Sequence, residues 1–311
     1  MAMSSTESTG ALLGLSNNLA DAVERAGLSV VAVNGRQQLA SSGVHWRAGM
    51  IVTADHTLDR DEGITVTLAD GRTVQATLAG RDSGTDLAVL KIDAGDMPTV
   101  EIGDSASLRI GNIVVAVARP GETGLSASMG TISALSGTWR TWAGGQIDQL
   151  VRPDLTLYPG FSGGPLVDAA GRVVGINTSG LSRRLTLAIP TSTVNRVTEQ
   201  LVSKGRISRG YLGVGMQPVR LPEALRSSTG LQQETALIVI SVESGGPAEQ
   251  AGVLVGDILV ALDGKPVADT HDVQSLLDPE RVGKSIPATV VRGGQRADLT
   301  ITVGERPRGG A

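Results

Sequence analysis

The stretch that organises the chain is Pro159-Gly160-Phe161-Ser162-Gly163-Gly164-Pro165-Leu166, in which one serine stands among three glycines. Glycines beside a serine let the backbone turn sharply and let a second molecule approach closely. A serine hydroxyl is a poor nucleophile unless a base takes its proton. A lone Gly-x-Ser-x-Gly also occurs in plain turns, but the longer string is more specific. The stretch therefore predicts a nucleophilic serine, and it directs the search to a base and to an acid that orients that base.

The composition favours a β-rich chain of two domains. A length of 311 residues fits about two domains. The 41 glycines and many short Val/Ile runs indicate antiparallel strands with turns, hence a barrel or a sandwich. A net charge of −4 predicts no general attraction to nucleic acid. No apolar run approaches the roughly 18 residues of a membrane span, and no signal peptide is visible at the N-terminus.

The apolar pattern divides the chain at residues 204–209, a short polar and basic stretch that we interpret as a linker. Residues 1–16 are small and polar and are expected to be flexible. Residues 17–26 predict a short helix with Leu19, Val23 and Ala20 on one face. A second helix is expected after Pro190, with its apolar face on Val194, Val197, Leu201 and Val202. The strand-like runs between the two helices are 29–33, 50–54, 64–68, 73–78, 87–92, 113–118, 127–134, 148–151, 165–167, 173–178 and 185–189.

The last unit, residues 210–305, predicts a small α+β domain, followed by a tail of residues 306–311. Its expected strands are 212–214, 237–242, 258–262, 288–292 and 298–303. Two helices are expected near 247–251 and 271–277.

The chain has three histidines that could serve as the base. Only His56 follows a buried-strand pattern, Met50 to Asp55. His45 lies beside Trp46 in what looks like a short polar turn, so a surface position is expected for it. His271 opens a predicted helix of the last unit, where a surface or groove position is expected.

The acid that orients the histidine should be a carboxylate at the mouth of a buried strand. Asp86 begins the run Asp86-Leu87-Ala88-Val89-Leu90 and fits this description. Asp82 is the competing candidate. Asp55 adjoins His56, but neighbouring strand residues point to opposite faces, so it is a poor partner.

The order His56, Asp86, Ser162 separates two folds that use a Gly-x-Ser-x-Gly motif. In α/β-hydrolases the serine comes first and the histidine last. Here the only histidine after Ser162 is His271, which lies in the separate last unit, and no βαβ pattern surrounds the serine. The order instead is that of chymotrypsin-like barrels.

Taken together, these blocks resemble the HtrA (Deg) family of serine proteases. Three blocks resemble the family's catalytic segments: Thr53-Ala54-Asp55-His56, Thr85-Asp86-Leu87-Ala88-Val89-Leu90-Lys91-Ile92, and Gly160-Phe161-Ser162-Gly163-Gly164-Pro165-Leu166-Val167. Later blocks resemble the strands after the serine and the entry to the PDZ domain: Val173-Val174-Gly175-Ile176-Asn177-Thr178, Ala188-Ile189-Pro190 and Arg209-Gly210-Tyr211-Leu212-Gly213-Val214. The resemblance covers residues 17–305.

The resemblance implies an all-β chymotrypsin-like double β-barrel at residues 17–203, followed by a small α+β PDZ domain at residues 210–305. It implies that His56 is the general base, Asp86 its orienting acid and Ser162 the nucleophile. The backbone N–H groups of Gly160 and Ser162 would form the oxyanion hole. An extended substrate would pair with Asn177, Thr178 and Ser179.

The resemblance also implies binding partners and a compartment. The loop Tyr211-Leu212-Gly213-Val214 would hold a C-terminal carboxylate in a nest of backbone N–H groups, with residues 271–277 flanking the groove. Unfolded or C-terminally tagged proteins would be substrates, with no metal or cofactor. An extracytoplasmic location is expected. Trimer contacts in relatives use N-terminal aromatic residues, whereas no aromatic residue precedes Trp46 here.

One departure leaves a second function open. The family usually has asparagine at the position of Phe161. A badly packed ring would let the Gly160 peptide turn its N–H out of the oxyanion hole. The alternative is a proteolytically silent chaperone or scaffold that binds peptides through its PDZ domain. Residues 135–146, with Trp139 and Trp142, match the region that acts as an activation loop in relatives.

Overall fold

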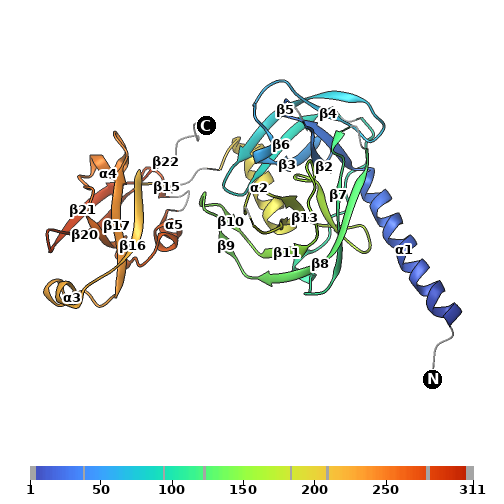
Figure 1. The fold of residues 1–311 in the computed structure, drawn as a ribbon. Helices are drawn as coiled ribbons and strands as arrows, with labels where there is room; N and C mark the ends of the chain where they lie inside the picture. The colour runs from blue at the N-terminus through green and yellow to red at the C-terminus, as the bar shows by residue number, and fades with distance from the viewer. Residues whose placement is uncertain are drawn as a thin grey trace. The chain divides into compact units, whose positions relative to one another are not determined.

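The computed structural model describes residues 5–37, 39–93, 95–121, 124–182, 184–207, 210–277 and 281–305. The chain divides into two units, Met1–Ile207 and Ser208–Ala311 (Figure 1). Residues 208 and 209 of the predicted linker, and the predicted tail 306–311, lie outside the described residues. No helix in the described ranges is long and apolar enough to cross a membrane.

The first barrel is a closed antiparallel sheet in the order β1-β2-β3-β6-β5-β4. Its centre is filled by Val, Ile and Leu side chains such as Val31, Ile51 and Leu90. Short 3-10 turns follow β3 at Asp55–Thr57 and precede the second barrel at Ser105–Ser107. The strands are β1 Val30–Asn34, β2 Ser41–Arg47, β3 Met50–Ala54, β4 Ile64–Thr67, β5 Thr73–Asp82 and β6 Leu87–Ile92.

Strand β2 is the element of this barrel that the sequence did not predict. The surface position expected for His45 is wrong, because the residue is only 1% exposed. Its ring accepts a hydrogen bond from the Gly49 N–H at Nε2 (3.1 Å) and lies 3.0 Å from the Pro98 carbonyl oxygen at Nδ1. The neighbouring Trp46 is also buried. Strand β2 lies between β1 and β3 and is covered on both faces. Polar side chains in it, such as that of His45, are therefore buried together with the groups to which they are hydrogen-bonded.

The second barrel is also closed, in the order β11-β14-β13-β12-β7-β8. Each of the six strand-like runs predicted between residues 113 and 189 corresponds to one of its strands. The fold class expected for the first unit is therefore confirmed. A short hairpin, β9 Trp139–Arg140 with β10 Gln146–Ile147, interrupts the path between β8 and β11. The barrel strands are β7 Ile113–Ala118, β8 Ser126–Ser136, β11 Leu150–Asp154, β12 Pro165–Asp168, β13 Val173–Thr178 and β14 Leu187–Pro190.

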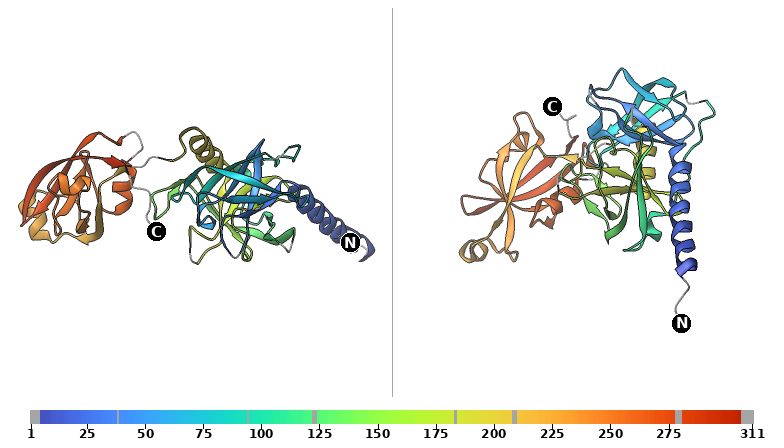
Figure 2. Two further views of the ribbon diagram at one scale, coloured as in Figure 1. Left: turned by 90° about the horizontal axis from the view of Figure 1, so that it is seen from above. Right: turned by 45° about the vertical axis from the view of Figure 1, so that its right-hand side comes forward.

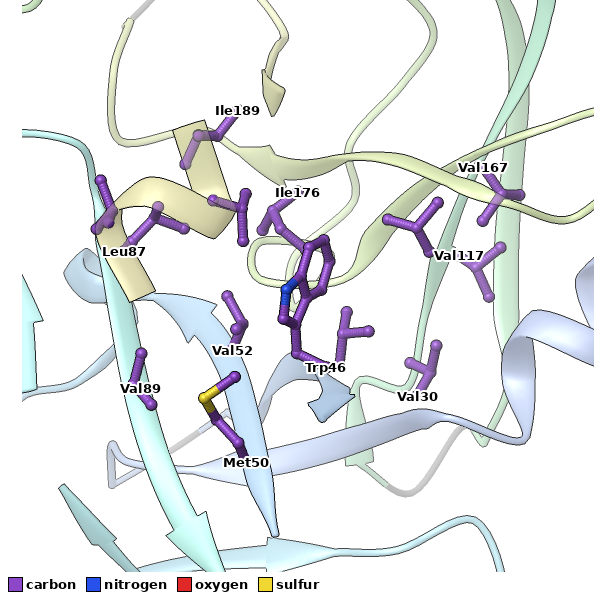
Figure 3. Packing of buried hydrophobic residues seen from close by; sticks show 14 of the residues in the cluster. Val30, Trp46, Met50, Val52, Leu87, Val89, Val117, Val167, Ile176 and Ile189 are labelled. Carbon is purple, nitrogen blue, oxygen red and sulfur yellow. The ribbon is translucent and has the colours of Figure 1, made fainter. Parts of the chain in front are cut away.

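A shared core joins the two barrels. Figure 3 shows Trp46 of the first barrel in one cluster with Val52 of its own barrel and Ile176 of the second. The Trp46 indole N–H donates to the Asn195 side-chain oxygen of helix α2 at 2.9 Å, which satisfies its buried donor. This core fixes the two barrels relative to each other, so residues at their facing ends can form one site.

Helix α1, Ser5–Gly27, is longer than predicted. The expected flexible segment 1–16 is thus helical from Ser5 onward, and residues 1–4 lie outside the described part. Among the described side chains of the helix, those that pack on the barrels are Leu19, Ala22, Val23 and Ala26 of its C-terminal part, whereas Ala20 is exposed. Once packing nucleates a helix, each further residue adds to it at little cost. The other end therefore continues away from the barrels (Figures 1 and 2).

Helix α2, Thr191–Lys204, closes the first unit as predicted after Pro190. Val194, Val197 and Leu201 are fully buried, but Val202 is 44% exposed and does not belong to the buried face. Gly205 follows the last turn with φ +72°, a left-handed conformation that favours glycine at a helix end.

The second unit is a small α+β domain, as predicted. Its main sheet runs β16-β17-β18-β20-β21, with β19 paired to β18, and a two-stranded sheet joins β15 to β22. Helix α3 was not predicted. The strands are β15 Gly210–Tyr211, β16 Val214–Arg220, β17 Thr235–Val242, β18 Ile258–Leu262, β19 Lys265–Pro266, β20 Ser285–Arg292, β21 Gln295–Thr302 and β22 Gly304–Glu305. The helices are α3 Glu223–Thr229, α4 Pro247–Gln250 and α5 Thr270–Leu276.

A forked ion pair braces this second unit. Arg292 donates from Nε and Nη2 to the two Asp257 carboxylate oxygens, each at 2.7 Å. The Asp257 side chain is 1% exposed and that of Arg292 is 39% exposed. The hydrogen bond from Arg292 lowers the pKa of Asp257 despite the burial of the carboxyl group.

We expect Asp257→Asn to destabilise the second unit by about 1–3 kcal/mol at neutral pH, because a charge-assisted bond is lost from a half-exposed pair. The folded state favours the carboxylate, so its stabilisation is present above the ordinary pKa of 3.8 and is lost as the pH falls through the lowered value. Urea unfolding of wild type and variant should therefore converge in acid. Asp298→Asn, on the exposed side of the same sheet, is the control. A gap that persists unchanged at the lowest pH would contradict this account.

Candidate active site

The ends of two paired strands bring His56 and Asp86 together. Ala54 of β3 is paired with Leu87 of β6, so the residues just beyond these strand ends are neighbours. The Asp86 carboxylate oxygen Oδ2 lies 2.8 Å from His56 Nδ1, and Oδ1 accepts the His56 backbone N–H at 2.8 Å. A carboxylate can only accept, so Nδ1 carries the proton and Nε2 is the acceptor of the ring.

Asp86 is held in place from both barrels. It is buried and has φ +58°, a conformation that costs a non-glycine residue free energy. Its carbonyl accepts the Asp55 N–H at 3.2 Å, and the hydroxyl of Thr178, at the end of β13, donates to its Oδ2. Sequence reasoning expected Thr178 to pair with substrate and missed this bond, because no local pattern relates two residues so far apart in the chain.

Asp82, the competing candidate for the acid, has a different set of partners. Its Oδ2 accepts from the Thr85 hydroxyl at 2.6 Å and from the Thr85 N–H at 3.0 Å, and its Oδ1 accepts the Gly84 N–H at 3.3 Å. These bonds shape the turn that leads into Asp86. The structure thus places Asp86, and not Asp82, against the histidine ring.

Asp55 is paired with an arginine. Arg81 Nε binds the Asp55 carboxylate, and Arg81 Nη2 donates to the Asp55 and Leu58 carbonyls at 3.1 and 3.0 Å. Burial raises the pKa of Asp55, although the Arg81 hydrogen bond opposes this rise. Because the guanidinium spans the turn that carries His56, it fixes the position of that turn on the barrel.

The backbone around Ser162 depends on two glycines. Gly160 has φ +87° and Gly163 has φ +86°. A Cβ at Gly160 would lie 2.4 Å from Pro120 Cβ, and one at Gly163 would lie 2.1 Å from the Ser42 carbonyl oxygen. Ser42 of the first barrel also binds the loop directly. Its hydroxyl donates to the Gly160 carbonyl at 2.8 Å and its N–H to the Ser162 carbonyl at 3.2 Å.

Phe161 packs into the second barrel. It is 3% exposed and meets Tyr158 edge-on, with ring centroids 5.6 Å apart. Its N–H donates to the Tyr158 carbonyl at 3.0 Å and closes a tight turn. Within the described part of the chain, the N–H groups of Gly160 and Ser162 have no protein acceptor. Phe161 is therefore accommodated, and two backbone donors beside the serine are left available.

Ser162 and His56 are connected through a residue that the sequence did not single out for this purpose. Ser162 Oγ lies 3.1 Å from Ser179 Oγ, and Ser179 Oγ lies 3.3 Å from His56 Nε2. The Ser179 N–H also donates to Ser162 Oγ at 3.3 Å. Between these described side chains there is no direct Ser162–His56 hydrogen bond.

Asn177 cannot pair with a substrate strand as expected. Its N–H donates to the Gly164 carbonyl and its carbonyl accepts the Gly163 N–H, both at 2.9 Å. Its side-chain amide donates to the Gly164 and Pro165 carbonyls at 3.1 and 2.8 Å. Because β13 lies between β12 and β14 in a closed barrel, this residue braces the serine turn from inside.

The predicted peptide loop of the second unit has a similar pair of available donors. The Leu212 and Gly213 carbonyls accept the N–H groups of Ala248 and Glu243, each at 2.8 Å. Gly213 has φ +76°. In the described ranges, the N–H groups of Leu212 and Gly213 have no protein acceptor. The loop precedes β16, and His271 lies exposed in α5, which packs against that strand.

No group of three or more His, Cys, Asp or Glu side chains is placed to hold a metal ion among the described residues.

Residues 41–176, which include His56, Asp86 and Ser162, match the trypsin-like peptidase domain. Residues 210–303 match the PDZ domain. The chain is thus a trypsin-like peptidase domain joined to one PDZ domain.

Comparison with individual proteins gives the family. The chain superposes on the HtrA-type protease AlgW with decapeptide at a TM-score of 0.73 and 33% identity, covering 94% of this chain and 99% of that one. A serine endoprotease from Yersinia pestis gives 0.73 and 33%, covering 93% and 98%. A probable periplasmic serine endoprotease, DegP-like, from Pseudomonas savastanoi pv. phaseolicola is 36% identical over 276 residues, 87% of this chain and 57% of the relative.

The chain belongs to the HtrA family of serine proteases, which confirms the predicted resemblance. It spans a little over half the length of the curated relatives it matches.

Proposed function

We propose that this chain is a serine endopeptidase that hydrolyses peptide bonds by acyl transfer. The observation that carries this proposal is the cluster in which the Asp86 carboxylate binds His56 Nδ1 while the ring presents Nε2 toward the Ser179–Ser162 pair. In the proposed reaction Ser162 Oγ attacks the carbonyl carbon of the peptide bond, and His56 takes the hydroxyl proton, which it later gives to the leaving amine. Asp86 holds the tautomer and stabilises the imidazolium.

The oxyanion of the tetrahedral intermediate would be bound by the N–H groups of Gly160 and Ser162. Neither N–H group has a protein acceptor in the described structure. The Gly160 carbonyl, in contrast, accepts a hydrogen bond from the Ser42 hydroxyl, which helps to fix the position of Gly160. Donors fixed in advance cost no reorganisation when charge develops, which makes this one of the largest contributions to catalysis. The burial of Phe161 supports the enzyme over the alternative of a silent binding protein, because that alternative depended on a badly packed ring.

Unfolded or C-terminally tagged proteins are the proposed substrates, since a chain must be extended to enter such a site. A peptide C-terminus is the proposed ligand of the loop Tyr211-Leu212-Gly213-Val214, with its carboxylate on the free N–H groups of Leu212 and Gly213.

The names of the relatives support an extracytoplasmic location. A homo-oligomer is a further proposal, and Leu12 and Leu13 of α1 are exposed apolar residues that it would bury.

Incubation with denatured casein tests the proposed activity. We expect cleavage at internal peptide bonds, with new N-termini distributed along the substrate and visible by mass spectrometry. The matched control is a folded, compact protein, which should be cleaved much more slowly. Trimming from the chain ends alone, or no cleavage of any denatured protein, would contradict an endopeptidase.

Peptide binding at the second unit is expected to raise the reaction rate of Ser162. The loop of residues 135–146 supplies a physical connection within the first unit, because the Thr141 hydroxyl donates to the Gly84 carbonyl at 2.6 Å, beside the turn that leads to Asp86. A ligand changes the rate only if it binds one arrangement of such an element more tightly than another.

The measurement is the rate of fluorophosphonate labelling as a function of peptide concentration. A peptide with a free C-terminal carboxylate should bind and increase the rate, and its C-terminally amidated form is the matched control, which should bind much more weakly. If the free peptide binds and the rate does not change, the PDZ domain tethers substrate without regulating the protease.

A further inference from the structure

Ser179 contacts both atoms that exchange the proton in the proposed reaction. Its hydroxyl lies 3.1 Å from Ser162 Oγ and 3.3 Å from His56 Nε2. The same residue donates its backbone N–H to Ser162 Oγ at 3.3 Å. Ser179 therefore bridges the nucleophile and the base in this structure.

The tautomer of His56 fixes the direction of each bond in the bridge. Since Nδ1 carries the proton bound by Asp86, Nε2 can only accept, so the Ser179 hydroxyl donates to it. That leaves Ser179 Oγ as the acceptor for the Ser162 proton. Nε2 has a single lone pair, and Ser179 occupies it. The Ser162 proton is thus directed to Ser179 and not to His56.

The segment that carries Ser179 lies directly against the histidine and its acid. A Cβ at the next residue, Gly180, would lie 2.6 Å from His56 Nδ1 and 2.7 Å from Asp86 Oδ2, so only glycine permits this path. The Gly180 N–H donates to the Thr178 hydroxyl at 2.9 Å, which in turn binds Asp86. Ser179 itself is exposed, beyond the end of β13. Its side chain is therefore free to rotate into solvent.

We propose that Ser179 is a further active-site residue that holds the site at rest, and that its hydroxyl must leave the bridge before Ser162 can attack. This inference rests on the proposed endopeptidase function. When the hydroxyl rotates away, the lone pair of Nε2 is released. The Ser162 proton then passes to Nε2 as the bond from Oγ to the carbonyl carbon forms, and the carbonyl π electrons move to the oxygen.

Labelling of Ser162 by a fluorophosphonate, in the whole chain and without peptide, tests the proposal. Ser179→Ala should label about three- to tenfold faster, the factor that corresponds to one hydrogen bond lost from the resting arrangement. Ser179→Thr restores a hydroxyl and should bring the rate back toward that of the wild type. Ser179→Gly, a second variant without the hydroxyl, should behave like the alanine variant.

Ser182→Ala is the control for the general effect of removing a serine hydroxyl from the segment that follows β13. Its hydroxyl oxygen accepts the Arg184 and Leu185 N–H groups at 3.2 and 3.0 Å, away from the cluster. Its labelling rate should equal that of the wild type. Thermal unfolding of each variant checks that the fold is intact.

The outcomes separate this inference from the proposed function. If the wild type labels in a His56-dependent manner and Ser179→Ala labels no faster, the endopeptidase stands and the resting bridge is wrong. A strong loss of rate in Ser179→Ala would mean that Ser179 relays the proton, which also overturns the proposal. If no variant labels at Ser162, the proposed function fails together with the inference.

Discussion

Replacement of Ser162 by alanine is expected to lower turnover on denatured casein by about 10⁶-fold, because the members of such a triad act as a unit. The hydroxyl oxygen is the only side-chain atom of Ser162 that can form the bond to the acyl group. The turn that carries it depends on Gly160, Gly163 and Ser42, so the alanine variant should keep its fold. The measurement is the initial rate of casein cleavage at equal protein concentration.

Ser182→Ala serves as the control for the loss of a serine hydroxyl elsewhere in the protease unit, and it should digest casein at the wild-type rate. Casein digestion by Ser162→Ala near the wild-type rate would show that another residue is the nucleophile.

Asp86→Asn is expected to reduce turnover by roughly 10⁴-fold. The amide has nearly the same shape but can donate a proton to His56 Nδ1, which favours the tautomer with the proton on Nε2 and leaves no base for Ser162. The amide oxygen can keep the place of Oδ1, which accepts the His56 backbone N–H at 2.8 Å, so part of the local structure should survive. Steady-state kinetics on a peptide substrate measure the loss.

Asp82→Asn is the matched control, since both carboxylates lie within one turn and both are buried. An asparagine there keeps an oxygen that can accept from the Thr85 N–H and hydroxyl, so the rate should change little. If Asp82→Asn were the more damaging of the two, the acid would have been assigned to the wrong residue.

Most strands of the barrels could be predicted because their apolar runs are long enough to stand out from the turns. Strand β2 could not, because Ser41, Ser42 and Gly43 look like a turn in the sequence. They are buried only because β1 and β3 flank them, and Ser42 meets the Ser162 loop. Such polar residues are recognised as core only once their partners, distant in the chain, are known.

The active site, too, could be predicted from the sequence only in part. The spacing and order of His56, Asp86 and Ser162 could be found from the sequence, since each follows or begins an apolar strand. The support from Thr178 and the bridge formed by Ser179 could not, because both depend on the end of β13 in the second barrel meeting the turns of the first. The resemblance implied that Asn177 pairs with substrate, whereas its side-chain amide donates to the Gly164 and Pro165 carbonyls inside the barrel.

Mapping the site of fluorophosphonate labelling tests the central claim most directly. The whole chain is labelled, digested and analysed by mass spectrometry, alongside His56→Ala. The account predicts that the label is on Ser162 and that its rate falls by several orders of magnitude in His56→Ala, because the serine hydroxyl is a poor nucleophile without its base. A label on another residue, or equal labelling of Ser162 in His56→Ala, would contradict a serine protease that uses His56 and Ser162.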